Sequence, residues 1–118
     1  MEISVDKDIS MTHPNLKEIL SRIKKELTRV YGKRIHEVRL FGSQARGDAS
    51  SESDIDVIVV LTDLSVHISR EQDLFFPFKY NLEKEFGTLI QVIFTTKERF
   101  DKSKAPLYVG VREESVAI

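Results

Sequence analysis

Residues 41–61 read FGSQARGDASSESDIDVIVVL, the most informative part of the sequence. Gly42 and Ser43 end one apolar run, and the next apolar run begins with two acidic residues, Asp54 and Asp56. Because side chains alternate between the two faces of a strand, the two carboxylates are predicted to share a face, about 7 Å apart. Two like charges at this distance repel each other unless a cation lies between them. The stretch therefore predicts a glycine turn beside a cation-binding pair of carboxylates.

The chemistry of these residues suits a nucleoside triphosphate. Carboxylate oxygens are hard ligands that favour Mg²⁺, and Mg²⁺ completes its shell with water and substrate phosphates. Gly42 and Ser43 lead into SQARG, a segment predicted to form a short helix whose first N–H groups can face an anion. Arg46 follows about one turn later, where its guanidinium can reach a phosphate oxygen.

Two other motifs and a simpler structural role could also explain these residues. Gly42 and Gly47 have the spacing of a P-loop, but Asp48 and Ala49 stand where that loop needs Lys and Ser or Thr. The apolar run 57–60 after the two acids excludes an EF-hand loop. Each half of the motif alone is more often structural: turn glycines in one case, solvated acids at the start of a strand in the other. The joint pattern is what points to a triphosphate site.

In the rest of the chain, the spacing of apolar residues predicts alternating helices and strands. A first helix is expected within 13–34, with Pro14 in its first turn and Gly32 at its stop. Further helices are expected at 69–87 with a kink or a split at Pro77, in a turn after residue 97, and from about Pro106. Strands are expected at 36–41, 54–61 and 88–96, with a short one at 115–118. The strand 54–61 is apolar on both faces and belongs in the middle of the sheet. The predicted fold class is α/β (α+β), a small mixed β-sheet with helices packed on it.

Length and composition limit what the protein can be. A chain of 118 residues with 41% hydrophobic residues is expected to form a single domain, residues 1–118. It has no cysteine, no signal peptide and no apolar run long enough to span a membrane, so a cytoplasmic location is expected. Its 18 basic and 19 acidic residues nearly cancel, which makes nucleic acid an improbable partner.

The motif resembles the signature of the DNA polymerase β-like nucleotidyltransferase superfamily, and within it the minimal nucleotidyltransferases. That signature is Gly-Ser, ten residues, then Asp-x-Asp on a strand, and the frequent GSxARG form occurs here as GSQARG. The resemblance implies that Gly42, Ser43 and Arg46 bind the triphosphate. It also implies that Asp54 and Asp56 are the catalytic residues and hold Mg²⁺ ions that assist nucleotide transfer.

One position departs from the family. Members usually bring a third carboxylate from a later strand, whereas the strand phase places Gln91 there. A glutamine can lend a neutral oxygen to a metal, but it cannot act as a general base near neutral pH. Three explanations stay open: activity with two carboxylates, an acid borrowed from a partner, or a cleft kept only for binding.

The resemblance also implies a partner and a reaction. Small members of the family work beside a helical HEPN-type protein, some as the antitoxin of a toxin-antitoxin pair. The leading expectation is therefore Mg²⁺-dependent transfer of AMP from ATP to such a protein. The alternative is a catalytically weak or inactive nucleotide-binding module that acts by binding its partner, and transfer to a small molecule or to RNA is more distant.

Overall fold

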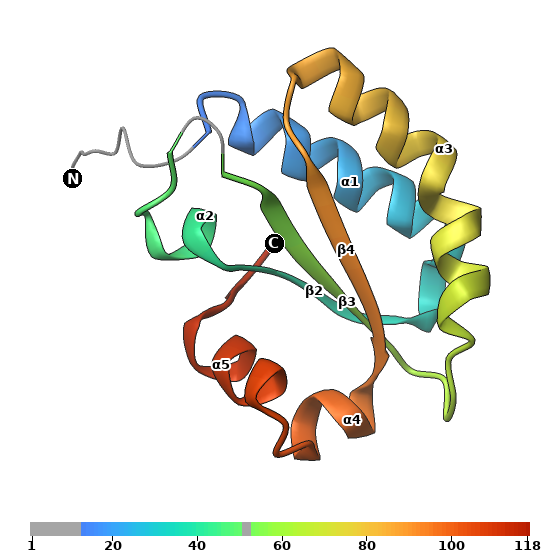
Figure 1. Cartoon of the computed structure of the whole chain (residues 1–118). Helices are drawn as coiled ribbons and strands as arrows, with labels where there is room; N and C mark the ends of the chain where they lie inside the picture. The colour runs from blue at the N-terminus through green and yellow to red at the C-terminus, as the bar shows by residue number, and fades with distance from the viewer. Residues whose placement is uncertain (1–12, 51–52) are drawn as a thin grey trace.

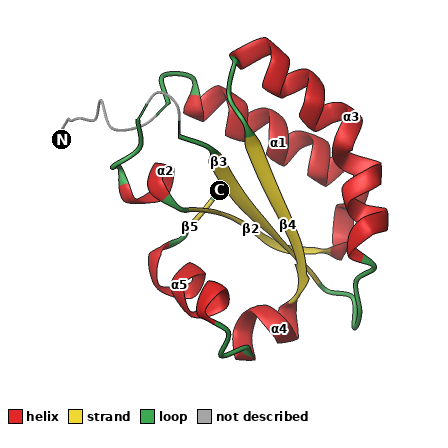
Figure 2. Ribbon diagram, viewed as in Figure 1, coloured by secondary structure: helices red, strands yellow, loops and turns green. Residues whose placement is uncertain are grey.

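A four-stranded mixed sheet, in the order β4-β3-β2-β5, organises the chain (Figures 1 and 2). The computed structural model describes residues 13–50 and 53–118. The strands are β2 (Ile35–Phe41), β3 (Ile55–Leu61), β4 (Ile90–Thr96) and β5 (Val116–Ala117). β2 runs antiparallel to both β3 and β5, whereas β3 and β4 are parallel. The predicted fold class and the central place of β3 are both confirmed.

Helices cover both faces of this sheet. They are α1 (Leu16–Tyr31), α2 (Ser43–Arg46), α3 (Ile68–Phe86), α4 (Lys97–Lys102) and α5 (Pro106–Glu114), and a 3-10 turn, Gly32–Arg34, follows α1. In Figure 1, α1 and α3 lie on one side of the strands, and α4 and α5 lie on the other. The two parallel strands are joined through α3, as parallel neighbours require a long crossover. No helix among the described residues is long and apolar enough to cross a membrane.

The alternation along β3 divides the core in two and places the acidic residues. Ile55, Val57 and Val59 pack into the larger cluster under α1 and α3. Ile58 and Val60 point the other way and pack with residues of α4 and α5. Asp56 has the phase of Ile58, and Asp54 precedes it by two residues, so both carboxylates lie on the α4/α5 face of the sheet.

Of the two predicted effects of Pro77, a kink or a split of its helix, the split is wrong. α3 runs unbroken through Pro77, although a proline inside a helix costs about 3 kcal/mol. Phe75 and Leu82, on either side of the proline, are both buried in the larger core. Phe75 also packs against Phe94 of β4, with ring centroids 6.2 Å apart. Tertiary packing of both halves of α3 thus outweighs the local preference of proline.

The remaining differences from the sequence prediction are small. Pro14 lies in the turn before α1 and not in its first helical turn, and β3 begins at Ile55, which leaves Asp54 immediately before the strand. The expected domain 1–118 includes residues 1–12 and 51–52, which lie outside the described residues.

Candidate active site

Three polar side chains meet where the parallel strands β3 and β4 begin. Asp54 and Asp56 come from the start of β3, and Asp56 pairs in register with Gln91 of β4. The Nε2 of Gln91 donates a hydrogen bond to Oδ2 of Asp54 at 3.2 Å. The phase that placed Gln91 beside the carboxylates in the sequence therefore matches the geometry. Its amide is a fixed neighbour of the acidic pair.

Gly42, in the glycine turn, lies directly beside the carboxylate of Asp56. It follows β2, and its backbone has φ 75° and ψ −158°, a region that is essentially reserved for glycine. A Cβ added at Gly42 would overlap Oδ2 of Asp56. β2 and β3 are antiparallel and Phe41 pairs with Asp56, so the end of one strand meets the start of the other. The glycine is required here because a carboxylate occupies the space beside its Cα.

The predicted short helix after Gly42 is present as α2, a single turn from Ser43 to Arg46. Gln44 is buried, and its Oε1 accepts a hydrogen bond from the N–H of His13 at 2.8 Å. This contact ties α2 to the chain before α1. Among the described residues, the N–H groups of Ser43 and Gln44 have no recorded acceptor, so both remain able to donate to an anion.

Arg46 is held by two acidic residues in the structure. Its Nε lies 3.2 Å from Oδ2 of Asp48, and its Nη1 lies 3.2 Å from Oε1 of Glu114 at the end of α5. Hydrogen bonds from Arg46 to Asp48, first, and to Glu114 raise the pKa of the guanidinium further. Sequence reasoning did not identify Glu114, because it lies 68 residues away and belongs to no motif. Any phosphate that binds Arg46 must share the guanidinium with these two acids.

The electrostatics of the acidic pair fit a bound cation. Burial, first, and the charge of Asp54 raise the pKa of Asp56, whereas Arg46 acts in the opposite direction. A divalent ion between the carboxylates would offset this repulsion. Among residues 13–50 and 53–118 there is no cluster of three or more His, Cys, Asp or Glu side chains able to hold a metal. The site thus offers two carboxylates and one amide oxygen, which suits an Mg²⁺ ion that keeps several water or phosphate ligands.

This electrostatic strain predicts the effect of Asp56→Asn on stability. Since the pKa of Asp56 is higher in the folded chain than in an unfolded one, the free energy of unfolding falls as pH rises through the interval between those two values. At neutral pH the penalty is fully present, and asparagine removes it. Thermal melts at pH 7 in EDTA are expected to show the variant about 2–5 °C more stable, with the difference vanishing at acidic pH. A less stable variant at pH 7 would contradict the assignment.

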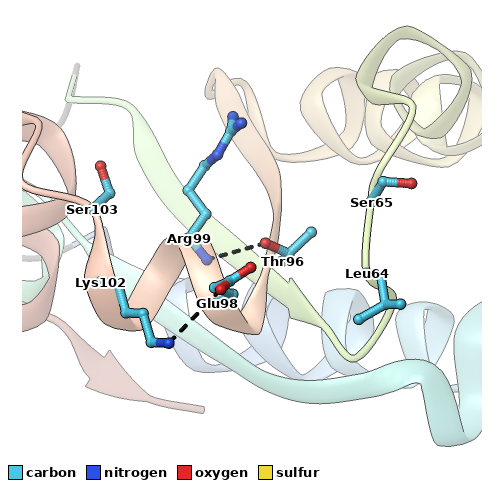
Figure 3. Close-up of a pocket in the computed structure, with 7 residues that line it drawn as sticks. All are labelled: Leu64, Ser65, Thr96, Glu98, Arg99, Lys102 and Ser103. Atoms are coloured by element: carbon cyan, nitrogen blue, oxygen red, sulfur yellow. Dashed lines mark hydrogen bonds and ion pairs between the residues drawn. The ribbon is translucent and has the colours of Figure 1, made fainter.

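A second hollow lies at the opposite end of the sheet and lacks this chemistry. This cavity has a volume of about 410 Å³. Figure 3 shows residues that line it: Leu64 and Ser65 after β3, Thr96 at the end of β4, and residues of α4. Its one carboxylate, Glu98, forms an ion pair with Lys102 at 3.7 Å. Without a pair of carboxylates beside a glycine turn, this cavity is not the candidate active site.

Comparison with known proteins identifies the family. Residues 20–116 match the family described as the nucleotidyltransferase domain, a span that includes the glycine turn, both acidic residues and α5. The chain belongs to the nucleotidyltransferase family. The family resemblance drawn from the Gly-Ser and Asp-x-Asp spacing is therefore confirmed.

Individual nucleotidyltransferases give the same result. The curated "Putative protein adenylyltransferase MJ0141" of Methanocaldococcus jannaschii is 30% identical over 80 residues, which is 68% of this chain and 79% of that protein. The protein adenylyltransferase MntA of Thermococcus cleftensis is 41% identical over 49 residues, 42% of this chain and 48% of that protein. A crystal structure described as a toxin-antitoxin with AMP-PNP matches the fold with a TM-score of 0.57 at 18% identity, covering 82% of this chain and 69% of that one.

Proposed function

We propose that this nucleotidyltransferase moves AMP from ATP to a hydroxyl group on a partner protein, with Mg²⁺ as cofactor. The observation that carries the proposal is the meeting of Asp54, Asp56 and Gly42 at one end of the sheet, where β2 ends and β3 begins. Asp54 and Asp56 would hold the metal, and Gly42, Ser43 and Arg46 would bind the phosphates. The relatives named protein adenylyltransferases support the choice of AMP and of a protein acceptor.

Each residue then has a defined task. The N–H groups of Ser43 and Gln44 and the guanidinium of Arg46 orient the triphosphate, while the amide of Gln91 orients Asp54. When bound, Mg²⁺ supplies charge neutralisation of the phosphates. The acceptor oxygen forms a bond to the α-phosphorus, the bond from that phosphorus to the bridging oxygen breaks, and pyrophosphate leaves with the electron pair. The acceptor's proton passes to a carboxylate of the pair or to water.

The partner that we propose is a small helical protein of the HEPN type, with this chain as the antitoxin of the pair. Three observations support a protein partner. The fold matches structures described as toxin-antitoxin assemblies, and the relatives in the family are named for action on proteins. Several large apolar side chains on α3, including Phe76 and Tyr80, are exposed and could contact a partner.

Isotope position tests the reaction class directly. The protein, the proposed HEPN-type partner and Mg²⁺ are incubated with ATP labelled at the α-phosphate or, in parallel, at the γ-phosphate. Nucleotide transfer puts only the α-label on the acceptor, because the β- and γ-phosphates leave as pyrophosphate. Label from the γ-position on the protein would show phosphate transfer instead and would sink the proposal.

A noncatalytic binding module is the second candidate, and Gln91 is the observation that favours it. Among the described residues no third carboxylate joins the pair in a metal-binding cluster, so nucleotide binding without transfer is chemically coherent. The two candidates separate in a test of partner neutralisation with the double variant Asp54→Asn, Asp56→Asn. Lost neutralisation with an intact complex supports the enzyme, whereas full neutralisation by the variant supports the binding module.

Gln91→Asp tests whether this position borders the metal site. A third carboxylate beside Asp54 should tighten Mg²⁺ binding by about tenfold, which corresponds to about 1.4 kcal/mol. Calorimetric titration measures the affinity, and the rise in melting temperature on adding Mg²⁺ should be larger than in the wild type. Leu64→Asp is the charge-matched control, since Leu64 is fully exposed and lies at the opposite end of the sheet, after β3. Equal Mg²⁺ affinities of the two variants would place Gln91 outside the metal site.

A further inference from the structure

A small cavity adjoins the candidate active site on the α4/α5 face of the sheet. It has a volume of about 210 Å³ and is walled by Gly42 and Arg46 on one side. Pro106, Leu107 and Gly110 of α5 form much of the other side, and Glu114 completes it. Neither the family motif nor the proposed roles of the catalytic residues account for this cavity.

Gly42 borders both this cavity and the proposed phosphate and metal site. The space beside the Cα of Gly42 is filled by the carboxylate of Asp56, and Gly42 itself forms part of the cavity wall. Arg46 is likewise shared, since it lines the cavity and was assigned to the triphosphate. A ligand whose phosphates lie at Gly42 and Ser43 therefore has this cavity within reach of its other end.

The size and lining of the cavity suit a flat ring. A volume of 210 Å³ is below the roughly 300–1,000 Å³ of pockets that enclose drug-sized ligands, so it admits a ring but not a whole nucleotide. The α5 wall is apolar, and the absence of a side chain at Gly110 leaves room, because a Cβ built there has no atom within 4 Å. Apolar walls with few polar groups at the rim are typical of sites that bind aromatic ligands.

Glu114 supplies the polar group at the rim. Its Oε1 accepts from Arg46, and no partner among the described residues is recorded for its other oxygen, Oε2. A carboxylate accepts hydrogen bonds and, when ionised, donates none, so it favours an edge that carries an amino group. Adenine has such an exocyclic amine, whereas uracil has none.

We propose that the cavity between α2 and α5 binds the nucleobase of the donor triphosphate, with Glu114 accepting from the exocyclic amine. This inference rests on the proposed function, because it assumes that the phosphates lie at Gly42 and Ser43. It assigns α5 a role in nucleotide selection that is separate from the chemistry at Asp54 and Asp56.

Calorimetric titration of the full chain in Mg²⁺ compares ATP with tripolyphosphate, which has the phosphates but no base. ATP is expected to bind at least tenfold more tightly than tripolyphosphate, and more tightly than UTP. Gly110→Phe fills the cavity and should remove this advantage while leaving tripolyphosphate binding unchanged. Val109→Phe is the matched control, since Val109 lies on the same helix, is exposed and does not line the cavity, and its affinities for ATP and tripolyphosphate should stay within about threefold of the wild type.

The outcomes separate the two proposals. Equal binding of ATP and tripolyphosphate to the wild type overturns the inference and leaves the proposed function standing. An equal loss of both ligands in Gly110→Phe also overturns it, because the cavity then holds phosphate. No binding of either ligand to the wild type overturns both.

A second measurement needs no variant. Photolabelling of the wild type with 8-azido-ATP should modify a peptide within residues 106–114, the segment that forms α5. Competition with excess ATP should suppress this label, whereas tripolyphosphate should suppress it less. Labelling confined to peptides outside α5 and α2 would overturn the inference.

Discussion

Replacing Asp54 and Asp56 together by asparagine is expected to lower nucleotide transfer by at least about 10³-fold while the fold is retained. The two carboxylates are the acidic groups of the proposed metal site, and no third acid joins them in a metal-binding cluster among the described residues. Asparagine keeps the shape of the side chain but removes the charge that holds Mg²⁺. Transfer is measured as the rate of AMP incorporation at saturating ATP and Mg²⁺.

Asp73→Asn is the control for this loss. Asp73 is exposed on α3, and the same substitution there removes one carboxylate outside the site. Circular dichroism and melting temperature should show that the double variant is folded and, in EDTA, at least as stable as the wild type, because repulsion at Asp56 is relieved. Transfer by the double variant at the rate of the Asp73 control would refute the role assigned to the pair.

Gly42→Ala is expected to cause the second largest loss, about 10²-fold in transfer rate, through displacement of Asp56. The new methyl group must overlap Oδ2 of that residue, so either the carboxylate or the turn has to move. The backbone at Gly42 also has positive φ in a region that other residues avoid, which adds a cost of roughly 1–3 kcal/mol in stability. Rates are measured below the melting temperature of the variant.

Gly47→Ala distinguishes the effect of backbone strain from the effect of displacing Asp56. Gly47 also has positive φ, at 79°, but a Cβ there has no atom within 4 Å. Its left-handed conformation costs alanine about 1 kcal/mol, and Asp56 is undisturbed. The Mg²⁺-induced rise in melting temperature should therefore persist in Gly47→Ala and be lost in Gly42→Ala. Equal behaviour of the two variants would mean that the contact with Asp56 does not matter.

The sequence predicts those parts of the structure in which the local pattern and the tertiary packing agree. In β3 the apolar run from Val57 onward predicts a central strand, and burial on both faces follows. The same strand phase predicts that Gln91 faces the acidic pair, and its hydrogen bond to Asp54 matches that placement. Both features depend on the two-residue period of a strand, which the sequence displays directly.

Features that depend on long-range contacts were not predictable from the pattern. No sequence pattern near Arg46 predicts its contact with Glu114. The cavity walled by Gly42 and Gly110 forms only because α5 packs over the sheet beside α2. The unbroken helix at Pro77 has a similar cause, since contacts of Phe75 and Leu82 with the core decide it. Local propensity ranks the options for a segment, and packing against distant residues selects among them.

Intact mass spectrometry of this protein together with the proposed HEPN-type partner distinguishes nucleotide transfer from binding alone. The two are purified as a complex and incubated with ATP and Mg²⁺, with the Asp54→Asn, Asp56→Asn variant in parallel. The partner is expected to gain the mass of one or more AMP units with the wild type and none with the variant. An unchanged partner mass in a stable complex that binds ATP would contradict transfer and would make this chain a binding module.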